Sequence, residues 1–221
     1  MAEKKLVLGY WASQNLSQPT RWLLVYHNIE FEDKLYTDPD SWFKKDKPAL
    51  KTPFPNIPYI IDGETVITES YATLQYAALK VGNPDLFGKN DLDSIRVHQN
   101  YGVAKDLFKV VKDLALNPEY EKVRDTTLSE KASPFLEKFS VALGEKDYPL
   151  EYLTWADFYL FNVLDLLLRM DEKSLDSWPN LKKLHERMNV ESIKAYRKTE
   201  GYIKYFIAPG FATWTGEEQA Q

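Results

Sequence analysis

The chain has 221 residues, enough for one large domain or two small ones, and a globular composition of 44% hydrophobic and 28% charged residues. Its formal net charge of −5 argues against nucleic acid as a partner, because phosphate contacts need clustered lysine and arginine. The absence of cysteine excludes disulfide scaffolds, Cys-ligated zinc and CxxC redox chemistry.

The first part of the chain alternates strand and helix patterns. We predict a strand over 5–11, a helix over 17–28, a strand over 30–36 and then an irregular, proline-rich segment over 37–53. Two short apolar runs around Asp62-Gly63 predict a hairpin over 57–68, and a helix follows over 71–81. This βαβ-ββα order predicts a small mixed sheet with helices on its faces.

The composition changes at residues 81–94, where Gly, Asn, Pro and Asp indicate a linker. Beyond it we find only helical spacing of apolar residues, over 104–115 and over 128–143, where Pro134 predicts a kink. Thr154 to Asp157 has the pattern of a capping box that opens an apolar core helix. We therefore predict two domains, residues 1–84 and an all-helical domain over 85–221.

Targeting and metal signals are absent from the sequence. No positive-then-apolar leader opens the chain, and its longest apolar run, 155–170, is short for a membrane span and carries Asp157 and Asp165. The three histidines are too far apart to form a metal-binding motif. We expect a soluble cytoplasmic protein with no metal and no membrane insertion.

The stretch FPNIPYIIDGETVITES (54–70) contains two features that favour a peptide-like ligand. If the bond before Pro58 is cis, the turn displays the N–H and C=O of Ile57 to an added strand; an ordinary edge-strand proline is the alternative. At the other end, backbone N–H groups near Ser70 attract a carboxylate and Glu69 attracts an ammonium, although a plain serine N-cap explains Ser70 equally well. A free amino-acid end would satisfy both features.

Tyr10 and Trp11 end the first predicted strand. Ligands of open α/β sheets bind beyond the carboxyl ends of strands, so Tyr10 could present its hydroxyl to a ligand there. An aromatic residue on a strand is more often part of the core, and Asp106, on the polar side of a predicted helix, is ordinarily a solvated carboxylate.

Taken together, several sequence pieces resemble the cytosolic glutathione S-transferases, above all the mu class and its parasitic-worm relatives. The resemblance runs through nearly the whole chain. The pieces, in order, are LGYW (8–11), FPNIPYIIDG (54–63), Glu69-Ser70, IRV (95–97), NPEYEK (117–122), TWADF (154–158) and LDSWPNLKKL (175–184).

The resemblance implies a thioredoxin-like N-terminal domain, an all-helical C-terminal domain, a homodimer, and conjugation of glutathione to small apolar electrophiles in detoxification. Glutathione is then a co-substrate, and no cofactor is expected. Tyr10 matches the catalytic tyrosine. The glutathione site implied by the family comprises Tyr10, Trp11, Leu16, Trp42, Lys47, Asn56, Ile57, Pro58, Glu69, Ser70 and the partner-facing Asp106. The implied electrophile pocket comprises Ser13, Leu16, Phe108, Lys112, Leu116, Ala208 and Pro209, and the implied dimer interface includes Phe54 and Gln75.

The chain also departs from the mu pattern. Glu69 stands where mu enzymes carry glutamine, and the short segment before Trp42 lacks an arginine ligand. One inserted residue after Trp42 leaves Lys45 and Lys47 as alternatives for the glycyl carboxylate, and we favour Lys47. Two other functions remain open: a non-catalytic carrier or structural relative, and a glutathione-dependent isomerase. Intact site residues favour the conjugating enzyme.

Overall fold

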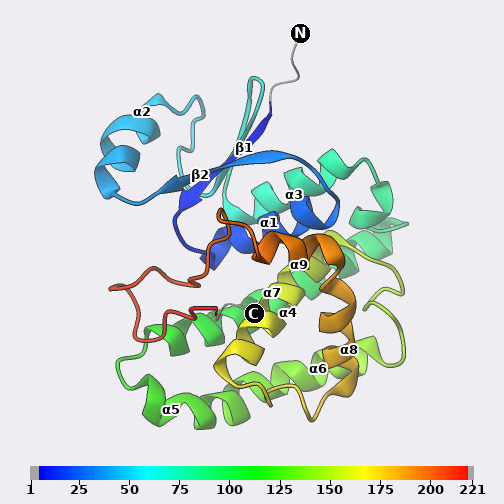
Figure 1. Cartoon of the computed structure of the whole chain (residues 1–221). Coiled ribbons are helices and arrows are strands. Elements are labelled where there is room, and N and C mark those ends of the chain that lie inside the picture. Colours follow the sequence, from blue (N-terminus) through cyan, green and yellow to red (C-terminus); the bar gives the residue numbers. More distant parts are fainter. Residues whose placement is uncertain (1–4, 219–221) are drawn as a thin grey trace.

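A four-stranded mixed sheet organises the first part of the molecule. The computed structural model describes residues 5–218, and Figure 1 shows the sheet above a larger helical part. Its strands are β1 (Leu6–Trp11), β2 (Phe31–Tyr36), β3 (Tyr59–Asp62) and β4 (Thr65–Thr68), in the spatial order β2-β1-β3-β4. β1 pairs parallel with β2 and antiparallel with β3, and β3 pairs antiparallel with β4. The predicted mixed sheet is confirmed.

Glycines fix two details of this sheet. Gly63, in the turn of the β3–β4 hairpin, has φ +61°, a left-handed conformation that glycine adopts without steric cost. Gly9 allows the Tyr59 ring to cross β1, because a Cβ at this position would lie only 2.1 Å from that ring. A side chain at residue 9 would therefore push the β3 aromatic away from the strand that carries Tyr10.

Two helices join the sheet to the helical part. α1 (Gln18–Tyr26) and α3 (Ser70–Val81) pack against each other, and both contact α7 of the helical part. They lie between the sheet and the helical part (Figure 1). Trp22, Leu23 and Leu24 of α1 are completely buried at this junction. Full burial of side chains this large stabilises the fold by about 1.5–3 kcal/mol each.

The prediction of an irregular 37–53 segment was wrong in its middle. Residues Ser41–Asp46 form a π-helical turn that continues into the short α2 (Lys47–Ala49). Trp42 explains the ordering, because its side chain is only 1% exposed and stacks on Tyr59 with ring centroids 5.9 Å apart. This tertiary contact overrides a polar, proline-containing local sequence.

The helical part comprises α4 (Asp91–Leu116), α5 (Tyr120–Thr127), α6 (Ser133–Leu143), α7 (Trp155–Met170), α8 (Pro179–Met188) and α9 (Glu191–Arg197). Shorter helical turns span Asn15–Ser17, Pro84–Phe87 and Leu128–Ala132. Within residues 5–218, no strand occurs after Thr68, as predicted. α7 is the central helix, and only Leu168 and Arg169 in it are not fully buried.

Local signals place the helix boundaries well. The predicted capping box opens α7, where the Thr154 N–H and hydroxyl donate to Asp157 Oδ2 at 2.7 and 2.8 Å. Pro134 lies in the first turn of α6, directly after the π-helical turn that separates α6 from α5. None of the helices in the described residues is long and apolar enough to span a membrane.

Candidate functional site

Tyr10 lies near the carboxyl end of β1, one of the two central strands of the sheet. Its side chain is 3% exposed, and burial raises its pKa to about 12, although a hydrogen bond with the Leu16 backbone and the charge of Arg21 both lower it. The hydroxyl therefore stays protonated at neutral pH and can donate a hydrogen bond. Tyr10 thus has the position that the strand pattern predicts.

The loop over residues 12–17, which we call the Tyr10 loop, is held from the sheet side by Arg21. This arginine is completely buried and donates through Nη1 to the Ser13 carbonyl at 3.1 Å. Its Nε and Nη2 donate to the two carboxylate oxygens of Asp33 on β2, at 2.8 and 3.2 Å. A two-point guanidinium–carboxylate pair fixes orientation as well as distance. The loop is therefore fixed relative to the sheet edge.

The Pro58 end of the hairpin has the expected backbone geometry. The Ile57–Pro58 peptide bond is cis, and Pro58 is buried directly before β3. The Ile57 N–H, however, donates to Asn56 Oδ1 at 3.0 Å. An added strand would need to take this N–H from the Asn56 side chain.

The start of α3 lacks a side-chain cap. Glu69 occupies the N-cap position with φ +74°, and its carboxylate accepts instead from Asn56 Nδ2 at 2.8 Å. Because no side chain caps the first turn, N–H groups that begin at Ser70 have the polarity to bind a carboxylate. Asn56 joins this helix start to the Pro58 turn.

Aromatic residues form a wall at the outer side of β1. Trp11 is half-buried, and its ring centroid lies 6.2 Å from Tyr36 and 6.0 Å from Phe43. Lys47 Nζ lies 5.6 Å from the Phe43 ring centroid, whereas Lys45 is exposed. Trp42 packs inward on Tyr59 and is almost completely buried.

The residues expected around the electrophile come from three separate segments. Ser13 and Leu16 belong to the Tyr10 loop, and Phe108, Lys112 and Leu116 lie on α4. Ala208 and Pro209 lie in the C-terminal segment after α9. Packing joins two of these segments: Phe108 contacts Phe206 edge-on at 5.7 Å, and the Trp214 N–H donates to the Ala115 carbonyl at 3.0 Å.

The predicted subunit-contact residues are open to solvent in one chain. Phe54 is 73% exposed, Gln75 on α3 is half-buried, and Asp106 lies exposed on α4. Among the described residues, no hydrogen bond or ion pair involves the Asp106 side chain.

Sequence reasoning missed a buried polar group behind the Tyr10 loop. A cavity of about 930 Å³ is lined there by residues that include Asp165, Arg169 and Arg197, and it does not include Tyr10. Gln14 reaches this group from the loop, since Arg169 Nη2 donates to Gln14 Oε1 at 2.6 Å. Asp165 and Arg169, spaced i,i+4 in the mostly apolar second half of α7, were the local signal.

Comparison with known proteins gives consistent matches along the chain. The family models "Glutathione S-transferase, N-terminal domain" and "Glutathione S-transferase, C-terminal domain" match residues 6–79 and 105–200. Glutathione S-transferase Mu 4 of Mus musculus is 34% identical over 218 residues, covering 95% of this chain and 98% of the relative. The class-mu 26 kDa isozyme 51 of Fasciola hepatica is 32% identical, covering 96% and 97%.

A solved structure agrees with these relatives. The Pi-class glutathione S-transferase of Onchocerca volvulus superposes with a TM-score of 0.75 at 27% identity, covering 87% of this chain and 92% of that one.

Proposed function

Because this chain belongs to the glutathione S-transferase family and is mu-like, it transfers glutathione to electrophiles, and we propose that Tyr10 holds the glutathione thiol as its reactive thiolate. The observation that carries the proposal is the protonated, buried hydroxyl of Tyr10 at the carboxyl end of β1, with the Leu16 backbone hydrogen-bonded to it. That backbone contact leaves the O–H free to donate to sulfur.

The size of the effect is adequate for catalysis. A free thiol with a pKa of about 8.5 is only about 3% thiolate at pH 7. A hydrogen bond to the charged sulfur, worth about 2–3 kcal/mol, lowers that pKa by roughly two units. At a pKa of about 6.5, roughly three quarters of the bound thiol is ionised, a gain of about 25-fold.

The reaction then needs no covalent enzyme intermediate. The thiol proton leaves to solvent, and a sulfur electron pair forms the bond to the electrophilic carbon. Any leaving group departs with its own bonding pair. Tyr10 supplies electrostatic stabilisation, and holding both reactants together adds to the rate.

We place the two charged ends of glutathione at opposite sides of Tyr10. The uncapped start of α3, with Ser70, receives the γ-glutamyl carboxylate, and Glu69 receives the ammonium. The backbone at Ile57, next to Pro58, pairs with the cysteinyl part. Lys47 and the edge of Trp42 receive the glycyl carboxylate, and Trp11, Leu16 and Asn56 complete the wall.

The electrophile lies on the other side of Tyr10, against α4 and the C-terminal segment. Ser13, Phe108, Leu116, Ala208 and Pro209 supply small and apolar surface, and the half-buried Lys112 supplies one positive charge. This composition favours apolar molecules that carry an electron-rich or anionic group.

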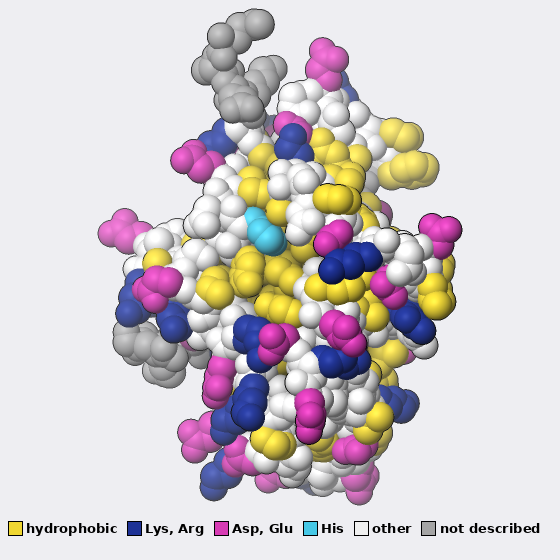
Figure 2. Space-filling view, turned by 90° about the vertical axis from the view of Figure 1, so that its right-hand side faces the viewer, with side chains coloured by type: hydrophobic (Ala, Val, Ile, Leu, Met, Phe, Trp, Pro, Cys, Tyr) yellow, Lys and Arg dark blue, Asp and Glu magenta, His cyan; other side chains and the backbone are white. Residues whose placement is uncertain are grey.

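We propose that two copies of the chain form a homodimer. Large hydrophobic side chains remain exposed on adjacent elements: Phe54 at 73%, Leu79 on α3 at 61%, and Leu92 and Ile95 on α4 at 58% and 65%. Figure 2 shows a face of the molecule where hydrophobic side chains gather along the middle, with charged ones around them. In the dimer, Phe54 inserts into the partner near Gln75, and Asp106 reaches the partner's γ-glutamyl site.

Membership of the family supports two further proposals, on the domain boundaries and on the cellular location. We assign residues 1–84 to the glutathione-binding domain and 85–221 to the helical domain, a division that falls between the two matched regions. We also propose a cytoplasmic location, where reduced glutathione is available as the only co-substrate.

A pH titration of glutathione bound to the purified protein tests the role of Tyr10. Thiolate absorbance in the ultraviolet should rise with a midpoint about two pH units below that of free glutathione. In Tyr10→Phe the midpoint should return close to the free value and conjugation should slow, because the phenyl ring donates no hydrogen bond. An unshifted midpoint in the wild-type complex would instead indicate a carrier.

A further inference from the structure

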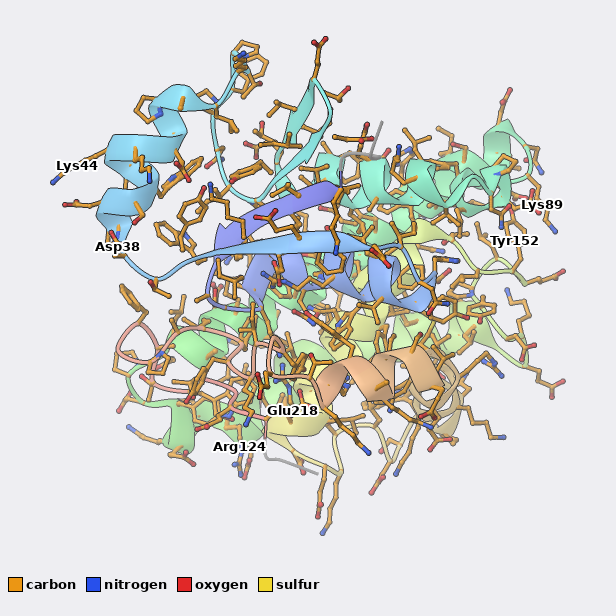
Figure 3. All side chains as sticks on the ribbon, turned by 45° about the horizontal axis from the view of Figure 1, so that its top comes forward. Asp38, Lys44, Lys89, Arg124, Tyr152 and Glu218 are labelled. Atoms are coloured by element: carbon orange, nitrogen blue, oxygen red, sulfur yellow. The ribbon has the colours of Figure 1, made fainter. Side chains whose placement is uncertain are left out.

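Behind the Tyr10 loop, five side chains form what we call the polar cluster: Asp165, Arg169, Arg197, Tyr202 and Glu218. Asp165 Oδ1 accepts from Arg197 Nη2 at 2.7 Å, and Arg169 Nε lies 3.6 Å from Asp165 Oδ2. Glu218 accepts from Arg197 Nη1 at 2.5 Å and from the Tyr202 hydroxyl. Figure 3 shows Glu218 beside α9, where the C-terminal segment returns to the helical part.

The polar cluster is charged and rigid. Burial alone would raise the pKa of Asp165, but Arg197, His185 and Arg169 hold it well below the usual range. The charged side chains of the cluster are at most 14% exposed, so each charge depends on its partners for stabilisation. Arg169 is fixed further because its Nη1 donates to the Gly216 carbonyl at 2.9 Å. The cluster therefore presents Arg169 Nη2 in one orientation.

Gln14 is the residue through which the Tyr10 loop contacts the polar cluster. Its side chain is 1% exposed, and its Oε1 accepts from Arg169 Nη2 at 2.6 Å. Its Nε2 donates to the Tyr202 hydroxyl at 2.9 Å and to the Ile203 carbonyl at 2.7 Å. All these partners lie more than 150 residues away in the sequence. One side chain thus ties the loop to the cluster through two hydrogen bonds and to the neighbouring Ile203 carbonyl through a third.

The backbone of Gln14 transmits this anchoring toward Tyr10. Its N–H donates to the Tyr205 carbonyl at 2.9 Å, and its own carbonyl accepts from the N–H groups of Ser17 and Gln18. Asn15, which directly follows Gln14, has φ +27°, an unfavourable conformation for a residue with a Cβ. Leu16, the next residue, carries the backbone group that lowers the pKa of Tyr10. A strained turn needs such anchors on both sides to persist.

We propose that Gln14 is a positioning residue for conjugation: tethered to the polar cluster, it holds the Tyr10 loop, including the Leu16 backbone, in place beside Tyr10, so that the Tyr10 hydroxyl faces the sulfur. The inference rests on the proposed role of Tyr10. Gln14 itself touches neither glutathione nor the electrophile in this assignment. Its loss should therefore change the thiolate fraction and kcat while leaving the KM for glutathione within about twofold.

The test compares Gln14→Met, which keeps the side-chain length and removes its hydrogen bonds, with wild type. At temperatures well below unfolding, the midpoint of bound thiol should rise by about half to one pH unit, a three- to tenfold loss of thiolate below the midpoint. Conjugation should slow by the same factor near pH 6 and recover above pH 9. Hydrogen exchange of the 12–17 amides should accelerate, with β2 unchanged.

A matched pair of tyrosine variants keeps the proposal testable if Gln14→Met does not fold. Tyr202→Phe and Tyr205→Phe each remove a hydroxyl that donates to a glutamate in the same segment, Glu218 and Glu217 respectively. Of these two hydroxyls, only that of Tyr202 bonds to the Gln14 side chain, whereas Tyr205 contacts Gln14 through its backbone carbonyl, which the substitution keeps. Only Tyr202→Phe should therefore raise the thiol midpoint, by less than Gln14→Met does. Equal behaviour of the two tyrosine variants would overturn the proposal.

Tyr10→Phe, titrated in parallel, distinguishes a failure of the Gln14 inference from a failure of the proposed role of Tyr10. If Tyr10→Phe raises the thiol midpoint and Gln14→Met lowers only thermal stability, Gln14 is structural and the positioning inference fails alone. If Tyr10→Phe leaves the midpoint unchanged, the proposed role of Tyr10 fails, and the Gln14 inference fails with it.

Discussion

Tyr10 shows how a single buried hydroxyl can be kept in the useful protonation state. Burial raises its pKa to about 12, well above the range in which a glutathione thiol titrates. In the mechanism that we propose, the thiol therefore ionises at a lower pH than the tyrosine, and the tyrosine remains the hydrogen-bond donor. The same separation predicts the shape of the pH profile.

With saturating glutathione, conjugation should rise about tenfold per pH unit below the midpoint of the bound thiol and then level off. No descending limb is expected up to pH 10, because the phenol is still protonated there. Rates corrected for the uncatalysed reaction, measured from pH 5 to 10, test this expectation. A descending limb below pH 9 that disappears in Tyr10→Phe would mean that Tyr10 ionises within the working range.

Individual site residues differ in how far the sequence predicts them. Tyr10 follows from the end of a recognisable strand, and Pro58 and Glu69 follow from a hairpin with clear turn chemistry. Gln14 could not be found in this way, because Arg169 and Tyr202, its partners, are brought to it only by the complete fold. Asn56 as a link to Glu69 was missed for the same reason.

Among the elements, α7 shows local and tertiary signals in agreement. Its capping box spans the four residues from Thr154 to Asp157, so the sequence contains the whole interaction, and its apolar run matches burial on all sides. The segment Ser41–Ala49 shows the opposite case. Its helical turns depend on Trp42 packing against Tyr36 and Tyr59 from other elements. The apolar residues of the segment itself have no helical periodicity that would predict these turns.

The start of α7 supports a prediction about stability. Asp157→Ala removes the acceptor of two Thr154 groups in a buried site, so unfolding free energy should fall by about 1–3 kcal/mol. Urea unfolding followed by circular dichroism measures the change. Asp176→Ala, at an exposed surface pair with Lys182, is a control and should change stability by less than about 1 kcal/mol. Equal losses in both variants would contradict a special role for the box.

At the scale of the whole molecule, the two parts of the chain depend on each other. α1 and α3 cover one side of the sheet and contact α7, and the C-terminal segment returns to the Tyr10 loop (Figure 1). The site residues described above therefore come from both parts. Periodicity in the sequence predicted both parts of the fold. The contact of the C-terminal segment with the Tyr10 loop could not be predicted, because that segment has no helix or strand pattern.

Assembly offers a further prediction at this scale. Phe54→Ser should shift the protein from dimer to monomer at micromolar concentration, because an exposed phenylalanine that fills a partner's pocket contributes strongly to association. Val141→Ser is a matched control, since Val141 is also 73% exposed but lies on α6. Sedimentation velocity separates the two forms. A Phe54→Ser protein that remains dimeric would rule out this residue as an interface anchor.

In the site that we propose, the carboxylate of glutathione binds at the uncapped start of α3, so binding of the co-substrate stabilises the native fold. Ligand at 100 times its Kd then adds about 2.7 kcal/mol to the stability of the native state. In a cell whose reduced thiol is exhausted, that increment disappears and more chains open to proteases. The lifetime of the protein should then follow the thiol supply, so that its abundance falls as soon as it has nothing to conjugate.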